Sequence, residues 1–365
     1  MAAAMALKTF ERYLAREIYA STAMVLAAFL MLFAFFDLIG QIQDLGHGGY
    51  QLENIVAFVV LTLPGRAYEL SPIAVLIGTV YALTTLARHS EITVLRASGL
   101  STGEFLKALL RIGIIFVVLT LAIGEFVAPP AERAAQQLRL KAMSSMVAQE
   151  FRSGLWVKDE RSFVNVRNVQ PDAKLREVRI YEFDPEYRLS SITDAAVGEF
   201  VAPDHWKLSD ITRTEFDANG NHSRVEHLPE LLWKSALNPD ILSVLLVVPE
   251  KMSVINLYQY IRHLAENQQK TERYVIAMWK KLVYPMTALV MMFLALPFSF
   301  MSTRGGAVSL RVFTGIMLGI GFHMLNGLFS NLGVINNWTP LLSAVTPSAI
   351  FLLGASGLLW WVERR

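Results

Sequence analysis

Long apolar runs flank one polar central region of the chain. A hydrocarbon core ~30 Å thick needs about 20 residues of helix to cross it, and five runs approach or exceed that length. They are Ile18–Gly40, Phe105–Val127, Leu282–Met301, Val312–Val334 and Leu341–Val362. Charged residues within them are few and lie mostly near their ends. The pattern predicts membrane-spanning helices on both sides of the polar region.

A sixth apolar stretch, Ile55–Leu86, is interrupted by Pro64 and Pro72. We expect one long, kinked helix, because neighbouring helices can satisfy the hydrogen bonds that proline removes inside a membrane. Arg66 and Glu69 are spaced i, i+3 in this stretch and can pair on one face. A structural ion pair is the simpler interpretation, and a substrate-facing role is the alternative. The chain thus has six predicted spans, three before and three after the polar region.

Basic residues in short loops mark the cytoplasmic side of a membrane protein. Nine of them fall on one side of the alternating spans and none on the other. The loops 41–54 and 335–339 lack Lys and Arg. The nine are Lys8, Arg12, Arg16, Arg88, Arg96, Arg304, Arg311, Arg364 and Arg365. Both termini are therefore expected in the cytoplasm and the polar region in the periplasm.

The polar region changes character along its length. Residues 131–149 contain no Gly or Pro and predict a helix that continues the third span. From Gly154 onwards, short runs with a period of two alternate with turn signals, and Asn219-Gly220 is a strong hairpin signal. We expect a β-sandwich or jelly roll over about 154–236. A helix beginning at Ser253 then leads to the fourth span.

Composition narrows the classes of function. Only 18% of the residues are charged and 53% are hydrophobic, which agrees with a membrane protein. The net charge of +2 gives no indication of nucleic-acid binding. The chain has no Cys, no glycine followed by lysine and hence no P-loop, and no HExxH or GxSxG motif. We therefore expect a non-catalytic subunit with no metal site and no cofactor of its own.

The loop between the second and third spans, Leu86–Thr102, carries the most specific local pattern. Glu91 stands at the positive end of a short predicted helix, and Ser101 with Glu104 forms a capping-box sequence for the next helix. Ile92 and Leu95 give the short helix an apolar side. Such a helix, at about 88–99, fits the groove of a cytoplasmic partner. The alternative is a helix that lies on the bilayer surface.

This loop resembles the coupling helix of the lipopolysaccharide-export permease family LptF/LptG. The resemblance extends, in order, over essentially the whole chain. Further similar segments are Ala122–Pro130, Gly154–Asp159, Asn238–Asp240 and Met278–Lys280. The segments Ala122–Pro130 and Gly154–Asp159 are closer to LptG than to LptF.

The resemblance implies an α-helical membrane protein with six transmembrane helices (3+3) and an inserted periplasmic all-β jelly-roll domain. Its divisions would be 1–128, 129–272 and 273–365. The implied function is that of an ABC transporter permease that extracts lipopolysaccharide from the inner membrane and passes it to a periplasmic bridge. The implied partners are an LptF-type paralogue, two copies of an LptB-type ATPase that binds ATP and Mg, and LptC.

Site residues follow from the resemblance only by matching positions. The acidic residue of the coupling helix maps onto Glu91. Its matching neighbours are Arg88, Ile92, Leu95 and Gly99. The first and fifth spans form the lipid gates in the family, and the corresponding wall candidates are Phe33, Phe36, Asp37, Phe322 and Leu325.

One departure affects the lipid headgroup. Relatives often have Lys near the outer end of the first span, whereas this chain has Asp37, Gln43 and Asp44. This part of the chain therefore lacks the Lys that would pair with a phosphate. Arg133 and Arg139, the partner chain, or divalent cations that bridge to the acids could replace it.

Two other classes of function stay open. One is an ABC-type permease for another lipid or for lipoproteins, although such permeases usually have four spans with the large domain after the first. The other is a membrane scaffold whose β-domain binds a ligand without transport. Such a scaffold would leave the amphipathic loop unexplained.

Overall fold

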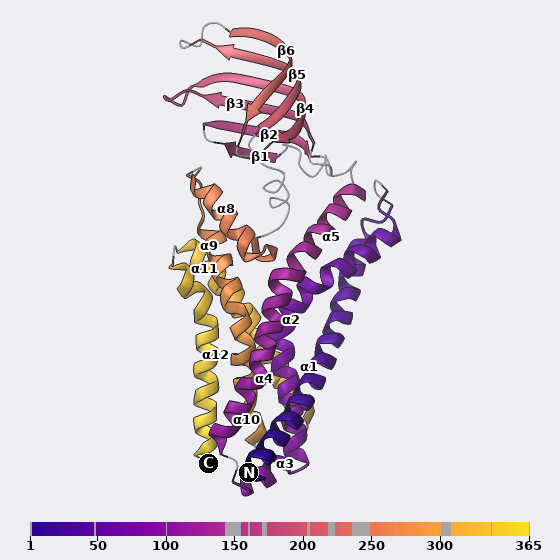
Figure 1. Cartoon of the computed structure of the whole chain (residues 1–365), viewed down its shortest axis with the longest axis vertical. Coiled ribbons are helices and arrows are strands. Elements are labelled where there is room, and N and C mark those ends of the chain that lie inside the picture. Colours follow the sequence, from indigo (N-terminus) through magenta and orange to yellow (C-terminus); the bar gives the residue numbers. More distant parts are fainter. Residues whose placement is uncertain are drawn as a thin grey trace.

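The structure, a computed structural model, describes residues 2–46, 49–99, 101–142, 155–159, 161–169, 174–202, 205–217, 223–235, 249–266, 268–300, 308–336 and 338–364. It contains six helices that are long and apolar enough to cross a membrane, and an antiparallel sheet inserted between the third and the fourth. The predicted fold class is confirmed at this level. Figure 1 shows the sheet at the end of the molecule opposite both termini.

The first three spans are joined by a short helix. They are α1 (Ala2–Ile42), α2 (Leu52–Arg88) and α4 (Thr102–Ala122), with α3 (Glu91–Ala97) between the last two. Helix α2 runs without interruption through Pro64 and Pro72, as predicted. The third span continues through a π-helical turn, η1 (Ile123–Val127), into α5 (Ala128–Ala142). The predicted extension is confirmed as far as Ala142, and its remainder lies outside the described residues.

The second three spans begin with a composite helix. Its parts are α9 (Glu272–Val283), the 3₁₀ turn η3 (Tyr284–Met286) and α10 (Thr287–Phe300). The other two spans are α11 (Val308–Ile335) and α12 (Pro340–Glu363). A 3₁₀ turn, η2 (Pro249–Lys251), and helix α8 (Val254–Glu266) lead from the β-domain to α9. The helix predicted from Ser253 is therefore confirmed.

Helix α2 lies at the centre of the bundle. In the most apolar 18-residue stretch of α2, 83% of the stretch is buried inside the protein. The corresponding share is 0% in α1 and 17% in α11, the fifth span. Buried side chains of α1, α2, α4 and α10 share one core cluster, and those of α2, α10, α11 and α12 share another. Gly78 allows the close approach of α1, since a Cβ there would lie 2.5 Å from Thr22 Oγ1. Helices α1 and α11 therefore keep broad apolar faces that the described residues of this chain do not cover.

The β-domain is one six-stranded antiparallel sheet with the strand order β1-β2-β3-β4-β5-β6. The strands are β1 (Leu155–Asp159), β2 (Ser162–Val169), β3 (Leu175–Phe183), β4 (Leu189–Ala202), β5 (His205–Phe216) and β6 (Ser223–Lys234). The inserted all-β domain is thus confirmed. Its described strands follow a meander, because each pairs with its neighbour in sequence, whereas a jelly roll requires Greek-key connections.

The two faces of the sheet differ in chemistry. One face carries an apolar cluster that includes Val164, Ile180, Trp206, Leu208 and Ile211, all almost fully buried. The other carries charged and aromatic side chains, with cross-strand ion pairs between Arg167 and Glu177 and between Arg179 and Asp194. This is the pattern of a sheet with one packed and one solvated face.

Candidate functional site

Helix α3 is held between two spans by defined end structures. Gly99, two residues after it, has φ +99°, a conformation that a residue with a Cβ rarely adopts. Helix α4 then begins with the predicted capping box, in which the Glu104 backbone N–H donates to Ser101 Oγ and the Ser101 backbone N–H donates to Glu104 Oε2. These features restrain the direction in which the chain leaves α3 and enters α4.

The five residues assigned to the coupling helix divide between two environments. Ile92 is 4% exposed and belongs to the core cluster that also holds Leu14 of α1 and Phe105 of α4. Arg88 and Gly99 are exposed, and Glu91 and Leu95 are half-buried. Ile92 thus anchors α3 to the bundle and does not lie on the outer face. The exposed apolar side chain there is Val94, at 65% exposure, which the sequence reasoning did not select.

The gate candidates also differ in their surroundings. Phe36 is exposed, while Phe33 lies below the Arg66 guanidinium, with 5.6 Å from Cζ to the ring centroid. Phe322 is only 2% exposed and packs edge-on against Phe351 of α12, with ring centroids 5.2 Å apart. Leu325 is half-buried. Phe322 is therefore part of the packed core in this conformation, and Phe36 is the open aromatic of the set.

Asp37 is the principal partner of Arg66. Arg66 Nη2 and Nε donate to the two Asp37 carboxylate oxygens at 2.7 and 3.0 Å, while Arg66 Nη1 lies 3.4 Å from Glu69 Oε2. The predicted i, i+3 pair is thus present but secondary to a bidentate pair between α1 and α2. The sequence did carry a signal for this pair: Asp37 is the one charged residue of the first apolar run, and Arg66 is the one basic residue of Ile55–Leu86. Asp37 is paired within the chain and connects the C-terminal part of α1 to α2.

The two arginines proposed for the headgroup have different partners. Arg139 Nη2 of α5 donates to Asp44 Oδ2 at 3.0 Å, just beyond the end of α1. Arg133 is half-buried, and among the described residues it makes no ion pair. Of the two, Arg133 keeps the more available charge.

A polar joint connects the two chain segments that lead into and out of the β-domain. We call it the connector joint, and it comprises Glu125, Glu132, Lys251 and Lys281. Lys251 Nζ of η2 donates to Glu132 Oε1 of α5 at 2.8 Å. Glu125 of η1 accepts the Val254 backbone N–H at the start of α8 at 2.9 Å. Lys281 Nζ of α9 donates to the backbone carbonyl of Met252. The joint therefore links the ends of the third and fourth spans that lie nearest the β-domain in the sequence.

The π-helical turn beside this joint packs without spare room. A Cβ on Gly124 would lie 2.4 Å from the Tyr68 ring of α2. The Tyr68 ring lies 4.9 Å from that of Tyr284, whose hydroxyl donates to the Glu69 backbone carbonyl. π-helical turns often occur at functional positions. Here the turn places Glu125 against α8 and Gly124 against α2.

Together these features define a multi-pass membrane protein of the permease class. Two groups of three spans carry one extramembrane β-domain, and a short helix projects from the opposite end. Among the residues that the structure describes, no group of His, Asp and Glu is arranged to hold a metal ion.

The chain belongs to the lipopolysaccharide export system permease LptF/LptG family, whose sequence profile matches residues 12–361. It is 32% identical to the lipopolysaccharide export system permease protein LptG of Escherichia coli strain K12 over 357 residues, which covers 97% of this chain and 98% of the relative. It is 30% identical to the LptG protein of Haemophilus influenzae over 368 residues, with 98% and 99% covered.

Proposed function

We propose that this chain is an LptG-type permease subunit of an ABC transporter. It extracts lipopolysaccharide from the inner membrane and passes it to a periplasmic bridge for export to the outer membrane. The observation that carries this proposal is the full-length similarity to two proteins named LptG. The exposed apolar faces of α1 and α11 support it, because a lipid path between two permease chains needs such faces.

An outside source of energy is part of the proposal. Each buried CH₂ of a lipid chain contributes ~0.8 kcal/mol to membrane binding, so a lipid with several acyl chains does not leave the bilayer unaided. The chain has no P-loop sequence. We therefore assign ATP and Mg binding to a separate LptB-type ATPase, present in two copies. An LptF-type paralogue completes the permease, and LptC receives the lipid.

Helix α3 is the proposed contact with the ATPase. Val94 is exposed, and Ile92 on the opposite side of the helix is buried in the bundle. Since Ile92 shares a core cluster with Leu14 of α1, a displacement of α3 reaches α1 directly. This orientation requires α3 and both termini in the cytoplasm and the β-domain in the periplasm.

Beyond α3, two contacts can carry the displacement further. The bidentate pair between Asp37 and Arg66 makes the outer part of α1 follow α2. The connector joint, through Glu132 and Lys251, makes the segments on both sides of the β-domain move together. In this mechanism the ATPase acts on one end of the bundle and the β-domain responds at the other.

The test is reconstitution of this chain with its paralogue and ATPase in lipid vesicles. ATP-dependent transfer of lipopolysaccharide to a soluble acceptor is measured, together with co-purification of the ATPase. We expect Glu91→Arg and Val94→Glu to lose co-purification or transfer while membrane insertion is unchanged. Val225→Glu, an equally exposed position on β6, is the matched control.

Two results would contradict the proposal. The first is normal ATP-driven lipid release by the Glu91→Arg complex. The second is a complex that binds the ATPase but moves no lipopolysaccharide, which would favour a different lipid substrate. Mass spectrometry of lipids that co-purify with the complex identifies the substrate in that case.

A further inference from the structure

The sheet of the β-domain is creased along one row that crosses several strands. In each of the four ladders from β2 to β6, the residue pairs directly before and directly after this row keep the same register, but the pair within the row is missing. The skipped residues, which we call the crease row, are Arg167, Glu177, Ala196, Asp210 and Pro229. Glu177 and Asp210 have φ of +52° and +55°, in the left-handed region that is unfavourable for a residue with a Cβ.

Proline explains one end of the crease. Pro229 lies on β6, the edge strand of the described sheet, and has no N–H to donate to the ladder. Strained backbone away from glycine persists only where the surroundings hold it, and it is frequent at functional positions. The crease is therefore a candidate for a site and not only an irregularity of pairing.

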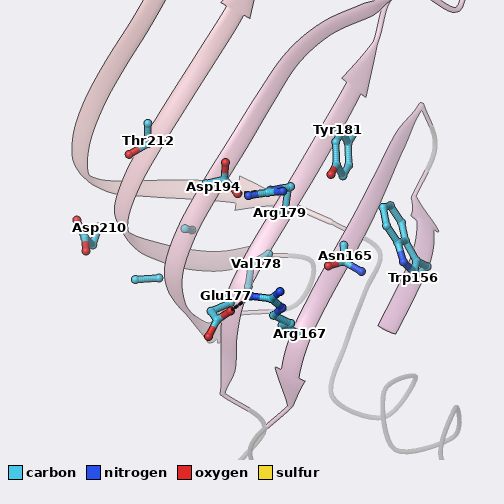
Figure 2. A pocket seen from close by; sticks show the side chains of 12 residues that line it. Trp156, Asn165, Arg167, Glu177, Val178, Arg179, Tyr181, Asp194, Asp210 and Thr212 are labelled. Atoms are coloured by element: carbon cyan, nitrogen blue, oxygen red, sulfur yellow. Dashed lines mark hydrogen bonds and ion pairs between the residues drawn. The ribbon is translucent and has the colours of Figure 1, made fainter. Parts of the chain in front are cut away.

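A hollow of about 520 Å³ lies over the crease on the polar face of the sheet. Four of the five residues of the crease row line it, together with residues of the neighbouring row, among them Trp156, Asn165 and Asp194. Figure 2 shows these side chains, which come from β1 through β5. The volume lies within the range of small-molecule sites.

One wall of the hollow is aromatic. The Trp156 indole is stacked on the Tyr181 ring, with centroids 5.6 Å apart and an interplanar angle of 21°. Trp156 is nevertheless 51% exposed, so Tyr181 supports the indole while part of it stays open to solvent. An aromatic side chain with a polar N–H, exposed and held in one orientation, suits ligands that present both an apolar face and hydroxyl groups.

The remaining lining is polar and nearly neutral. It contains two arginines and three carboxylates, a formal net charge of −1. Both arginines are paired, Arg167 with Glu177 and Arg179 with Asp194. Among the described residues the Asp210 carboxylate makes no ion pair. This balance disfavours a phosphate, which needs unpaired cations, and favours a ligand with many hydroxyl groups.

We propose that this hollow binds an uncharged saccharide. The apolar C–H face of a sugar ring would lie on Trp156, and its hydroxyl groups would donate to Asp210 and exchange hydrogen bonds with Asn165 and the paired arginines. The identity of the saccharide rests on the proposed function, which makes it part of the neutral sugar portion of the exported lipid. The hollow would then hold the carbohydrate outside the β-domain, on the face opposite its apolar cluster.

The test uses the full-length chain in lipid nanodiscs and a lipid-free core oligosaccharide of lipopolysaccharide, both native and dephosphorylated. Binding is measured by calorimetry and by saturation-transfer NMR. We expect the dephosphorylated probe to bind. Trp156→Ala should weaken binding by about tenfold, equivalent to roughly 1.4 kcal/mol, and Trp156→Phe should retain most of it.

A second variant keeps the result interpretable if Trp156→Ala disturbs the sheet. Asp210→Gly removes the carboxylate but accepts the left-handed backbone, so the fold is retained and binding should again fall about tenfold. Tyr187→Ala removes an exposed aromatic of the β3–β4 turn outside the hollow and should bind as the wild type does.

The outcomes separate this proposal from the proposed function. No binding, binding of the phosphorylated probe alone, or equal binding by wild type and both hollow variants overturns the saccharide site. Lipid transfer is measured in parallel. A chain that binds the probe but transfers no lipid contradicts the transport proposal, while transfer without any probe binding contradicts the saccharide site only.

Discussion

In the connector joint, we expect removal of the Lys251 charge to lower the free energy of unfolding more than removal of the Glu132 charge. The Glu132 side chain is 3% exposed, accepts from Lys251 at 2.8 Å and also accepts from Gln136 at 3.1 Å. The Lys251 side chain is 36% exposed, so water reaches its ammonium group. Lys251→Met leaves an uncompensated buried carboxylate and should cost about 3 kcal/mol. Glu132→Gln leaves a solvated ammonium and should cost about 1 kcal/mol.

The assay is denaturant-induced unfolding of the full chain in detergent, with both single variants and the double variant. The double variant has no carboxylate at position 132, so no buried charge is left unpaired. It should therefore be more stable than Lys251→Met alone. The chain has no native Cys, so cysteines introduced at the exposed Gln137 of α5 and Gln259 of α8 can carry a unique spin-label pair. Lys251→Met should broaden their distance distribution. Equal costs for the two single variants, or an additive double variant, would refute the reasoning.

Three further predictions concern the bundle and the β-domain. Gly124→Ala places a methyl group against the Tyr68 ring and should lower the free energy of unfolding by roughly 1–3 kcal/mol. Gly321→Ala, whose added Cβ meets no atom within 4 Å, should not destabilise the bundle. Unfolding midpoints in detergent compare the two variants. A double-mutant cycle on Asp37 and Arg66 should give a coupling of about 1–2 kcal/mol, and a coupling near zero would contradict the bidentate contact. The isolated β-domain should give a β-rich circular dichroism spectrum, and a mainly helical one would contradict the strands β1 to β6.

The sequence was sufficient for the spans because each depends on composition over about 20 residues. The uninterrupted α2 through Pro64 and Pro72, and the capping box at Ser101, were also predictable, since each rests on local chemistry. The strand order was not, because turn signals mark where strands end but not whether the next strand returns beside the last or crosses over. In the meander each strand returns beside the one before it, and the turn signals alone do not specify this.

The sequence predicted where the short helix α3 lies in the chain, but not which of its side chains face the bundle. The pattern placed Ile92 and Leu95 on one apolar side, and the structure shows that Ile92 is the residue committed to the bundle. The contact between Asp37 and Arg66 joins residues 29 positions apart, so i, i+3 spacing alone favoured Glu69. The creased sheet row gave no local signal except Pro229, because it arises from five strands together.

Helix α1 is attached to its neighbour at two separate places. Leu14 and Ile18 are fully buried near its beginning, and Asp37 is bound near its end, while Met24, Met31 and Phe35 in between face outwards. A helix that is held near both ends bends most easily in its middle. Separation of α1 from an adjacent protein can therefore occur by flexing of this middle stretch, with no rupture of either attachment and with little change in the length of the molecule.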